Sequence, residues 1–284
     1  MISIGLFHST IRGDEKLIIK AAKKRKVNLK LYDIRNLILE KSFFPFDFDI
    51  ALNRSVSNTK GRYLTAFLES CGIKVVNSLS VTQNCEDKFF TSLLLKKNNV
   101  PTIPFAIVFS LSQALEFVES VGGFPVVIKP TLGSWGRLLA KVNDKDALEA
   151  IIEHKNHFTS PHHQAFYIQK YVDKNGRDIR AFCVGNNVIA AIYRKSSHWI
   201  TNTARGGKAF NCPINRDLEL ICQKASLAVG GGILAMDIFE TKEGYLINEI
   251  NHTMEFKNSE EPTGVSISGA IIDYCIDLFQ KNKI

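Results

Sequence analysis

The sequence predicts a small parallel α/β domain followed by two α+β lobes, and three patterns support this fold class. The first third alternates short apolar runs with amphipathic helical stretches, which is typical of parallel strands linked by crossover helices. The rest of the chain is richer in strands. Turns at 185–187 and 242–244, rich in glycine and asparagine, predict two β-hairpins. We expect domains at residues 1–85, 86–165 and 166–284.

Each predicted element follows from its hydrophobic periodicity and its boundaries. In the first domain we expect strands at 2–7, 28–34, 48–54 and 73–78, with helices at 14–25 and 60–72 between them. In the second we expect helix 86–99, strand 100–110, helix 111–122, and strands 124–130 and 138–143. In the third, a helix at 217–230 separates the strand-rich segments 165–197 and 233–251. No G-x-G-x-x-G follows the first strand, so a dinucleotide site is not expected there.

The composition is that of a globular protein. Hydrophobic residues make up 45% of the 284 and charged residues 23%, and no apolar run reaches the ~18 residues of a membrane span. The N-terminus has no basic leader or cleavage pattern, so it is interpreted as a first strand, and the expected location is the cytoplasm. Six dispersed cysteines without a C-x-x-C pair predict reduced, mostly buried thiols.

Two features leave alternatives open. The formal net charge of +8 suits nucleic acid, an acidic membrane surface, or an acidic protein or substrate, and charge alone does not choose among them. The segment 153–164 contains His154, His157, His162 and His163. Because this segment is polar throughout, we interpret it as a mobile loop rather than as a metal site.

Polar residues interrupt three apolar strands. Lys129 ends one strand, Asp237 lies in a second, and Glu249 and Asn251 lie two apart in a third. Residues two apart in a strand point to one face, roughly 7 Å apart along the chain. Two oxygen donors on one face suit a hard cation. The alternative is an internal ion pair, such as Lys129 with Glu249.

Beyond Lys129 lies the stretch PTLGSWGRLLA. Gly133 and Gly136, with Ser134 between them, predict a turn between two strands whose N–H groups could hold phosphates beside the lysine charge. An ordinary hairpin with Trp135 packed beneath it is the alternative. Further along, cations occur among carboxylates and amides, which suggests phosphate charge balanced by arginine and metal: Arg177, Asp178, Arg180, Arg194, Asn202, Arg205 and Lys208.

The order of these motifs resembles an ATP-grasp ligase of the RimK type over the whole chain. The motifs that carry the resemblance are Lys88 in CEDKFFT, Lys129 in VVIKP, GSWGR, IQKYV followed by GRDIR, Arg194, TNTARGGKA, Asp237 and NEINHTMEFKNS. Within that family the chain looks most like the LysX ligases of the carrier-protein route to lysine. The resemblance implies an ATP-grasp fold with an N-terminal pre-ATP-grasp domain.

The resemblance also implies an ATP site between the two C-terminal lobes. The nucleotide-binding residues would be Lys88, Lys129, the closing loop Gly133, Ser134, Trp135, Gly136 and Arg137, the hinge Gln169, Lys170, Tyr171 and Val172, and Asp178 and Asn202. Lys170 departs from the acidic residue common in the family, which weakens any contact from this position to the ribose. Asp237, Glu249 and Asn251 match the family's magnesium ligands, with two ions expected, and Arg180 and Arg194 would stabilise the phosphate.

The implied reaction converts a carboxylate into an acyl phosphate, which an amine then attacks to form an amide. The carboxylate would be the γ-carboxyl of the C-terminal glutamate of the acidic carrier protein LysW, and the amine would be that of L-2-aminoadipate. Attraction of an acidic carrier accounts for the basic charge without nucleic acid or membrane. Implied substrate-binding residues are Arg194, Thr203, Ala204, Glu255, Phe256, Lys257, Asn258 and Ser259. Asn258 followed by the small Ser259 resembles the aminoadipate pattern, whereas Gly-Phe is typical of glutamate ligases of the arginine route.

Other functions stay open from sequence. A RimK-type glutamate ligase of the arginine route, of a cofactor tail or of a ribosomal-protein tail would share the ATP chemistry, and so would a carrier-dependent ligase of secondary metabolism. A non-enzymatic basic binding protein belongs to a different class and predicts no ADP release. Relatives suggest a homodimer or homotetramer.

Overall fold

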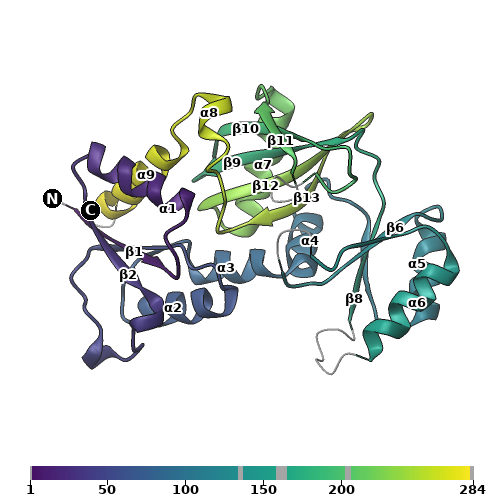
Figure 1. Ribbon diagram of the computed structural model, residues 1–284, viewed down its shortest axis with the longest axis horizontal. Coiled ribbons are helices and arrows are strands. Elements are labelled where there is room, and N and C mark those ends of the chain that lie inside the picture. Colours follow the sequence, from purple (N-terminus) through teal and green to yellow (C-terminus); the bar gives the residue numbers. More distant parts are fainter. Residues whose placement is uncertain (1, 134–136, 158–164, 202–205, 282–284) are drawn as a thin grey trace.

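The computed structural model describes residues 2–133, 137–157, 165–201 and 206–281, whose strands form three sheets (Figure 1). The first sheet is parallel, as predicted, in the order β2–β1–β3–β4. Its strands and the short helices η1 and η2 are β1 (Ser3–His8), β2 (Asn28–Asp33), η1 (Ile34–Asn36), η2 (Lys41–Phe43), β3 (Ile50–Asn53) and β4 (Val75–Val76). The helices of this region are α1 (Gly13–Lys24), α2 (Asn58–Ser70) and α3 (Leu79–Glu86).

Local sequence explains where these helices begin and which face they bury. The Ser57 hydroxyl accepts a hydrogen bond from the Lys60 N–H and so caps α2. In α1, Ile18, Ala21 and Ala22 recur at helical spacing and are buried, while its lysines face solvent. The predicted alternation of apolar strands and amphipathic helices is therefore confirmed in the first domain.

The middle lobe contains an antiparallel sheet in the order β5–β8–β6–β7, with α5 and α6 packed against it (Figure 1). Its elements are α4 (Lys88–Lys97), β5 (Phe105–Val108), α5 (Leu111–Ser120), β6 (Val126–Lys129), β7 (Ala140–Val142), α6 (Lys145–Asn156) and β8 (Phe166–Lys170). Strand β8 pairs with β5 and β6. It therefore extends the middle sheet, whereas the sequence-predicted boundary places its residues in the last lobe.

The histidine segment differs from its prediction at its start. His154 lies inside α6, and His157 caps the end of that helix. The loop interpretation is therefore wrong for 153–156, while His162 and His163 lie outside the described residues. Within the described ranges no group of three or more His, Cys, Asp or Glu side chains could hold a metal ion.

The last lobe is built on an antiparallel sheet in the order β11–β10–β9–β12–β13. Its elements are β9 (Arg177–Val184), β10 (Asn187–Lys195), β11 (Lys208–Asn211), α7 (Arg216–Val229), β12 (Ile233–Thr241), β13 (Gly244–Asn251), α8 (Glu260–Thr263) and α9 (Ile267–Lys281). Both predicted hairpins are confirmed, because β9 pairs with β10 and β12 with β13 across the expected turns.

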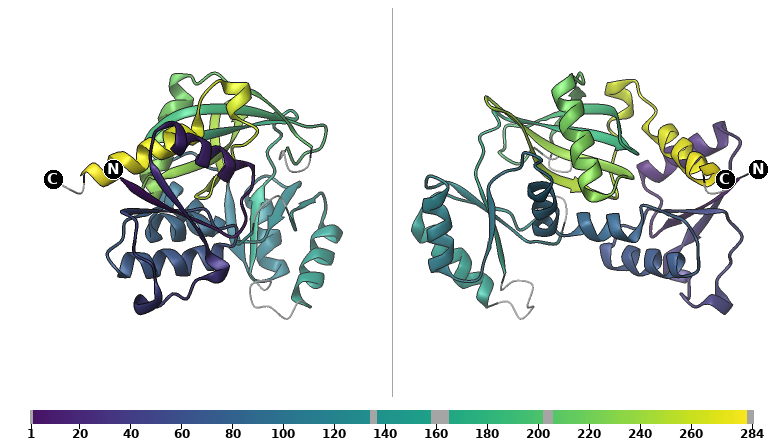
Figure 2. Two further views of the ribbon diagram at one scale, coloured as in Figure 1. Left: turned by 60° about the vertical axis from the view of Figure 1, so that its left-hand side comes forward. Right: turned by 180° about the vertical axis from the view of Figure 1, so that it is seen from behind.

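The two faces of this sheet have different partners. Ile179, Ala181 and Cys183 of β9 pack with α7, which covers one face (Figure 2). Phe182 and Val184 point to the opposite face, where α9 and α1 join the same core. The C-terminal helix α9 thus lies beside α1 and ties the end of the chain to the first domain (Figures 1 and 2).

The state of the cysteines and the lengths of the described helices can be compared with what the composition predicts. All six cysteines are free thiols, five of them buried and Cys71 half-buried, as predicted. In the part of the chain that the structure describes, no helix is long and apolar enough to cross a membrane.

Candidate active site

A cavity lies on the face of the last sheet that α7 does not cover. Side chains from all three regions line it, among them Arg12 of the first domain, Lys129 of the middle lobe and Glu249 of the last sheet. Most of the described residues predicted to bind nucleotide, metal or substrate also line it: Lys88, Gly133, Arg137, Gln169, Lys170, Tyr171, Val172, Asp178, Arg180, Arg194, Asp237, Asn251, Glu255, Lys257, Asn258 and Ser259.

Strand register brings the predicted metal ligands together. Asp237 of β12 lies directly opposite Glu249 of β13, and Asn251 lies opposite Ala235. On its other side Asp237 lies opposite Arg180 of β9. Two carboxylates and one amide therefore project from adjacent strands into the cavity. Magnesium is commonly held by one or two carboxylates together with substrate phosphates, so this donor set fits it.

Cations neutralise these carboxylates. Arg180 Nη1 donates to Asp237 Oδ1 at 2.9 Å, and Arg194 Nη2 lies 3.2 Å from the other oxygen of Asp237. Lys88 Nζ lies 3.5 Å from Glu249 Oε1 and also donates to the carbonyl oxygen of Gly133 at 2.7 Å. Burial alone would raise the pKa of Glu249, but the charges of these neighbouring cations hold it below its ordinary value.

A break in register adds a residue that sequence reasoning missed. Between the pairs Asp237–Glu249 and Ile238–Ile247 the ladder contains a β-bulge, and the extra residue is Asn248. Asn248 also lines the cavity, and its Oδ1 accepts a hydrogen bond from Lys129 Nζ at 2.8 Å. The direct partner of Lys129 is thus Asn248, while Glu249 is paired with Lys88.

Lys129 is a cation held away from water. It is 6% exposed, and its burial lowers its pKa to about 8, although the nearby Glu249 charge acts in the opposite direction. A buried lysine at the end of β6 supplies a point charge that an incoming phosphate can neutralise.

Asp178, predicted to contact the nucleotide, is bonded to Arg194, Thr201 and Lys174 in the structure. Its side chain accepts two hydrogen bonds from Arg194, at 2.7 and 2.8 Å, and one from the Thr201 hydroxyl at 2.5 Å. Lys174 Nζ also donates to it at 3.2 Å. Burial would raise the pKa of Asp178, but the Arg194 charge and these bonds keep it low. The two bonds from Arg194 fix the orientation of its guanidinium, while the predicted nucleotide contact of Asp178 stays a prediction.

The hinge predicted at 169–172 lies at the end of β8, between the middle and last lobes. Gln169 is 1% exposed, and its Nε2 donates to the Tyr167 hydroxyl at 2.7 Å, which in turn bonds the Ser92 hydroxyl at 2.7 Å. Lys170 is exposed and lines the cavity rim, and Lys141 Nζ lies 3.9 Å from the ring centre of Tyr171. Buried, hydrogen-bonded Gln169 thus contrasts with solvent-facing Lys170.

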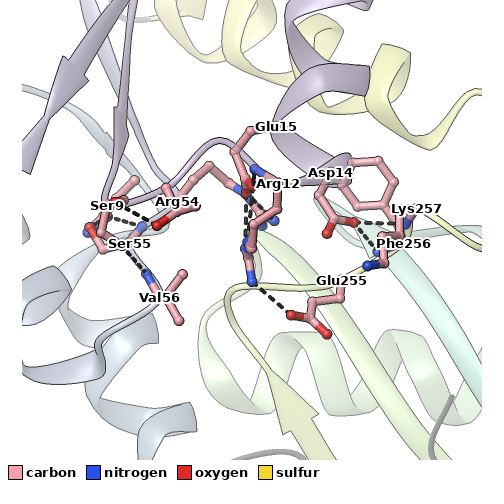
Figure 3. A network of polar contacts seen from close by, with 12 residues as sticks. Ser9, Arg12, Asp14, Glu15, Arg54, Ser55, Val56, Glu255, Phe256 and Lys257 are labelled. Carbon is pink, nitrogen blue, oxygen red and sulfur yellow. Dashed lines mark hydrogen bonds and ion pairs between the residues drawn. The ribbon is translucent and has the colours of Figure 1, made fainter. Parts of the chain in front are cut away.

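The predicted substrate segment 255–259 lies against the first turn of α1 (Figure 3). Arg12 Nη1 donates to Glu255 Oε1 at 2.8 Å. Asp14 Oδ1 accepts the backbone N–H groups of Phe256 and Lys257, at 2.6 and 2.8 Å. Phe256 was predicted to bind substrate, but its side chain does not line the cavity. The side chain is 1% exposed and belongs to the core shared with α1 and α9.

Some predicted residues cannot be placed, and some cavity residues were not predicted. Ser134, Trp135, Gly136, Asn202, Thr203 and Ala204 lie outside the described residues. The unpredicted charged and polar lining residues include Arg12, Lys174 and Asn248. Arg12 could have been noticed, because it lies in the connection between the first strand and the first helix, and functional groups collect beyond the carboxyl ends of parallel strands.

A parallel α/β domain joined to two lobes, with buried lysines and strand-borne carboxylates between them, defines an ATP-grasp ligase. The chain belongs to the RimK-like ATP-grasp family. The family model of the RimK-like ATP-grasp domain matches residues 85–275, and the LysX pre-ATP-grasp domain model matches residues 4–84. The predicted fold class and family are therefore confirmed, and ATP binding follows from the family.

Named relatives are similar over nearly the whole chain. The alpha-aminoadipate–LysW ligase LysX of Saccharolobus solfataricus is 33% identical over 274 residues, which cover 95% of this chain and 99% of that protein. The glutamate–LysW ligase ArgX of Sulfurisphaera tokodaii is also 33% identical, over 95% of this chain and 97% of that protein. Among solved structures, a RimK domain ATP-grasp protein from Sphaerobacter thermophilus has a TM-score of 0.79 at 23% identity, covering 96% of this chain and 99% of the other.

Proposed function

We propose that the protein joins the α-amino group of L-2-aminoadipate to the C-terminal glutamate γ-carboxylate of a LysW carrier protein, with ATP cleaved to ADP, in lysine biosynthesis. The observation that carries this proposal is the cavity itself. Buried lysines and the carboxylates Asp237 and Glu249 line it, and so do Glu255, Lys257, Asn258 and Ser259. A relative of this length and similarity is named for the same reaction.

The lysines of the cavity would bind the phosphates of ATP. Lys88 lies beside Glu249, and Lys129 is held by Asn248, so both charges are already turned toward the carboxylate pair. Asp237, Glu249 and Asn251 would hold magnesium, with two ions expected, and the metal would supply neutralisation of the transferring phosphoryl group. The carrier carboxylate becomes an acyl phosphate, and no enzyme nucleophile is needed.

Arginines would stabilise the phosphate as it leaves. Arg194 is 3% exposed and is held from two sides, by Asp178 and by Asp237. Arg180 is bonded to Asp237 through Nη1, while its buried Nε has no hydrogen-bond partner among the residues that the structure describes. A guanidinium fixed in this way needs little reorganisation when charge develops beside it.

The acidic carrier accounts for the net charge of +8 through long-range attraction. Nucleic acid and membrane are not needed to explain it. Assembly as a homodimer or homotetramer stays a prediction.

Glutamate is the competing acceptor. LysX and ArgX relatives share the same 33% identity with this chain, so overall similarity does not separate the two substrates. The residues Asn258 and Ser259 favour aminoadipate, because a small side chain at 259 leaves room for one more methylene than a phenylalanine would. A carrier-dependent ligase of secondary metabolism would share this chemistry, and finding lysine-pathway genes beside the coding gene would separate the two. A non-enzymatic binding protein is inconsistent with the ligase family.

The test is direct mass measurement of the carrier. The protein is mixed with ATP, magnesium, LysW and one amino acid at a time, and the carrier is then weighed. The expected result is one aminoadipate added per carrier with an equal amount of ADP released. Addition of glutamate in preference to aminoadipate would support the ArgX-like alternative, and no modified carrier with either would reject the proposal.

A further inference from the structure

The first domain contributes a guanidinium to the substrate part of the cavity. Arg12, directly before α1, lines this cavity, and its side chain is 21% exposed (Figure 3). Its Nη1 donates to Glu255 Oε1 at 2.8 Å. Arg12 is not among the motifs that carry the resemblance or among the predicted substrate residues.

Glu15 fixes the Arg12 guanidinium through the nitrogens that do not contact Glu255. Its Nε and Nη2 donate to the two carboxylate oxygens of Glu15, at 3.1 and 3.0 Å. Glu15 is fully buried and also accepts a hydrogen bond from Arg54 at 3.1 Å. Burial would raise the pKa of Glu15, but its bonds to Arg12 and the Arg54 charge hold it below the ordinary value. Glu15 therefore stays ionised and leaves Nη1 of Arg12 pointing at Glu255.

The charges of this cluster balance only when Glu255 is included. Arg12, Arg54 and Lys257 are cations, and Asp14 and Glu15 supply two of the negative charges, so Glu255 supplies the third. The two carboxylates bonded to Arg12 differ in exposure, because the Glu15 side chain is 0% exposed and that of Glu255 is 37% exposed. Because Glu255 is the more exposed partner and both it and Arg12 line the cavity, a carboxylate that enters the cavity can take the place of Glu255 on Arg12.

A second cation lies close by. A Cβ at Gly13 would lie 2.9 Å from Lys257 Cδ, so the Lys257 side chain runs against the residue next to Arg12. Asp14 holds the segment 255–259 against the start of α1, because it accepts hydrogen bonds from the N–H groups of Phe256 and Lys257. Two basic side chains from different domains thus flank one part of the cavity.

We propose that Arg12 binds the distal carboxylate of the acceptor amino acid, in exchange for Glu255. This inference rests on the proposed function. The reacting amine must lie near the carboxylate pair Asp237 and Glu249, where phosphoryl transfer takes place. The carboxylate at the far end of the side chain then extends toward Arg12 and Lys257. A guanidinium is suited to this task because its planar donors match a carboxylate.

The experiment compares two acceptors that differ only in this carboxylate. L-2-Aminoadipate carries it, and L-2-aminopentanoate lacks it. In Arg12→Met the KM for aminoadipate should rise about 10- to 100-fold, as expected for one lost hydrogen bond between charged groups. The KM for aminopentanoate and that for ATP should not change. Arg25→Met is the matched control, because Arg25 also ties α1 to the end of the chain, through Asp273 at 2.5 Å, yet does not line the cavity.

The outcomes separate this proposal from the proposed function. An equal rise in KM for both acceptors, or no rise for either, would overturn the role of Arg12 while leaving the ligase reaction intact. If Arg12→Met does not fold, Arg12→Lys keeps a cation beside Glu15 and should show a smaller, still selective rise, and an unselective effect would count against the proposal. If the unmodified protein ligates neither aminoadipate nor glutamate, the proposed function fails and this inference fails with it.

Discussion

Asp237 and Glu249 lie opposite each other on neighbouring strands, and the register of β12 and β13 breaks immediately beyond this pair. The bulge turns Asn248 toward the same cavity, where it accepts a hydrogen bond from Lys129. Adjacent residues of one strand therefore contact different lysines, since Glu249 lies beside Lys88 while Asn248 accepts a hydrogen bond from Lys129. A regular strand would send these two side chains to opposite faces.

If Glu249 holds magnesium, Glu249→Gln should abolish turnover while the protein stays folded. The substitution keeps the shape of the side chain and removes its charge, so the expected loss in rate is on the order of a thousandfold or more. ADP release and thermal unfolding measure the two effects. Glu240→Gln is the control, because Glu240 lies on β12 and pairs with Arg177 outside the cavity. Near-normal ADP release by Glu249→Gln would favour a purely structural ion pair with Lys88.

The pKa of Lys129, lowered by burial to about 8, predicts a pH dependence of ATP binding. Lysine is charged below its pKa, so the charge that would bind phosphate is present below about pH 8 and is lost as the pH rises above it. The KM for ATP should therefore rise across this range. Lys129→Arg should remove the rise, because arginine stays protonated. A KM with the same pH profile in both proteins would rule out this assignment.

Steering of an acidic carrier predicts a selective salt effect. The apparent KM for the carrier should increase steeply between low and physiological ionic strength, because salt screens long-range attraction between oppositely charged proteins. The KM for the free amino acid should change little. Steady-state kinetics at several salt concentrations measure both values. Equal salt sensitivity of the two would mean that the net charge of +8 has another origin.

The acceptor preference should depend on Asn258 and Ser259. One methylene in a fitted pocket is typically worth about 1 to 3 kcal/mol, or roughly 10- to 200-fold in kcat/KM. Aminoadipate should therefore exceed glutamate by at least about tenfold in the unmodified protein. The double substitution Asn258→Gly with Ser259→Phe should shrink or invert this ratio. Competition of both amino acids for one carrier, read by mass, gives the ratio directly.

Asp14 should contribute to folding stability through the segment it holds. Asp14→Ala leaves the N–H groups of Phe256 and Lys257 without their acceptor, and we expect a loss of about 2 to 4 kcal/mol in the free energy of unfolding. Asp14→Asn retains an oxygen acceptor and should lose much less. Asp146→Ala is the matched control, since Asp146 occupies the same position in the first turn of α6 and is exposed. Equal losses of stability in Asp14→Ala and Asp146→Ala would show that the effect arises at the helix N-terminus and not from the hydrogen bonds to Phe256 and Lys257.

The elements that sequence predicted well are those whose signal is local. Hydrophobic periodicity marked most of the strands and helices, and the turns at 185–187 and 242–244 marked the hairpins, because each depends on residues close together in the chain. Periodicity missed α3, β11 and α9. The placement of β8 was less accurate. Which sheet a strand joins depends on its pairing partners, here β5 and β6, which are distant in sequence. The hydrophobic periodicity of β8 does not identify these partners.

Sequence by itself determined the fold class, and the order of its motifs gave the resemblance to the family. Lys129, Asp237, Glu249 and Asn251 stood out because charged and amide side chains are conspicuous among apolar neighbours, whereas most of the other predicted cavity residues followed from the resemblance. Tertiary structure alone decided how these residues are paired. It assigned Asp178 to Arg194, placed the Phe256 side chain in the core, and brought Arg12 and Asp14 to a segment more than 240 positions away. Side-chain charges in a cavity interact through space, so their partners follow from strand register and domain packing rather than from proximity in the chain.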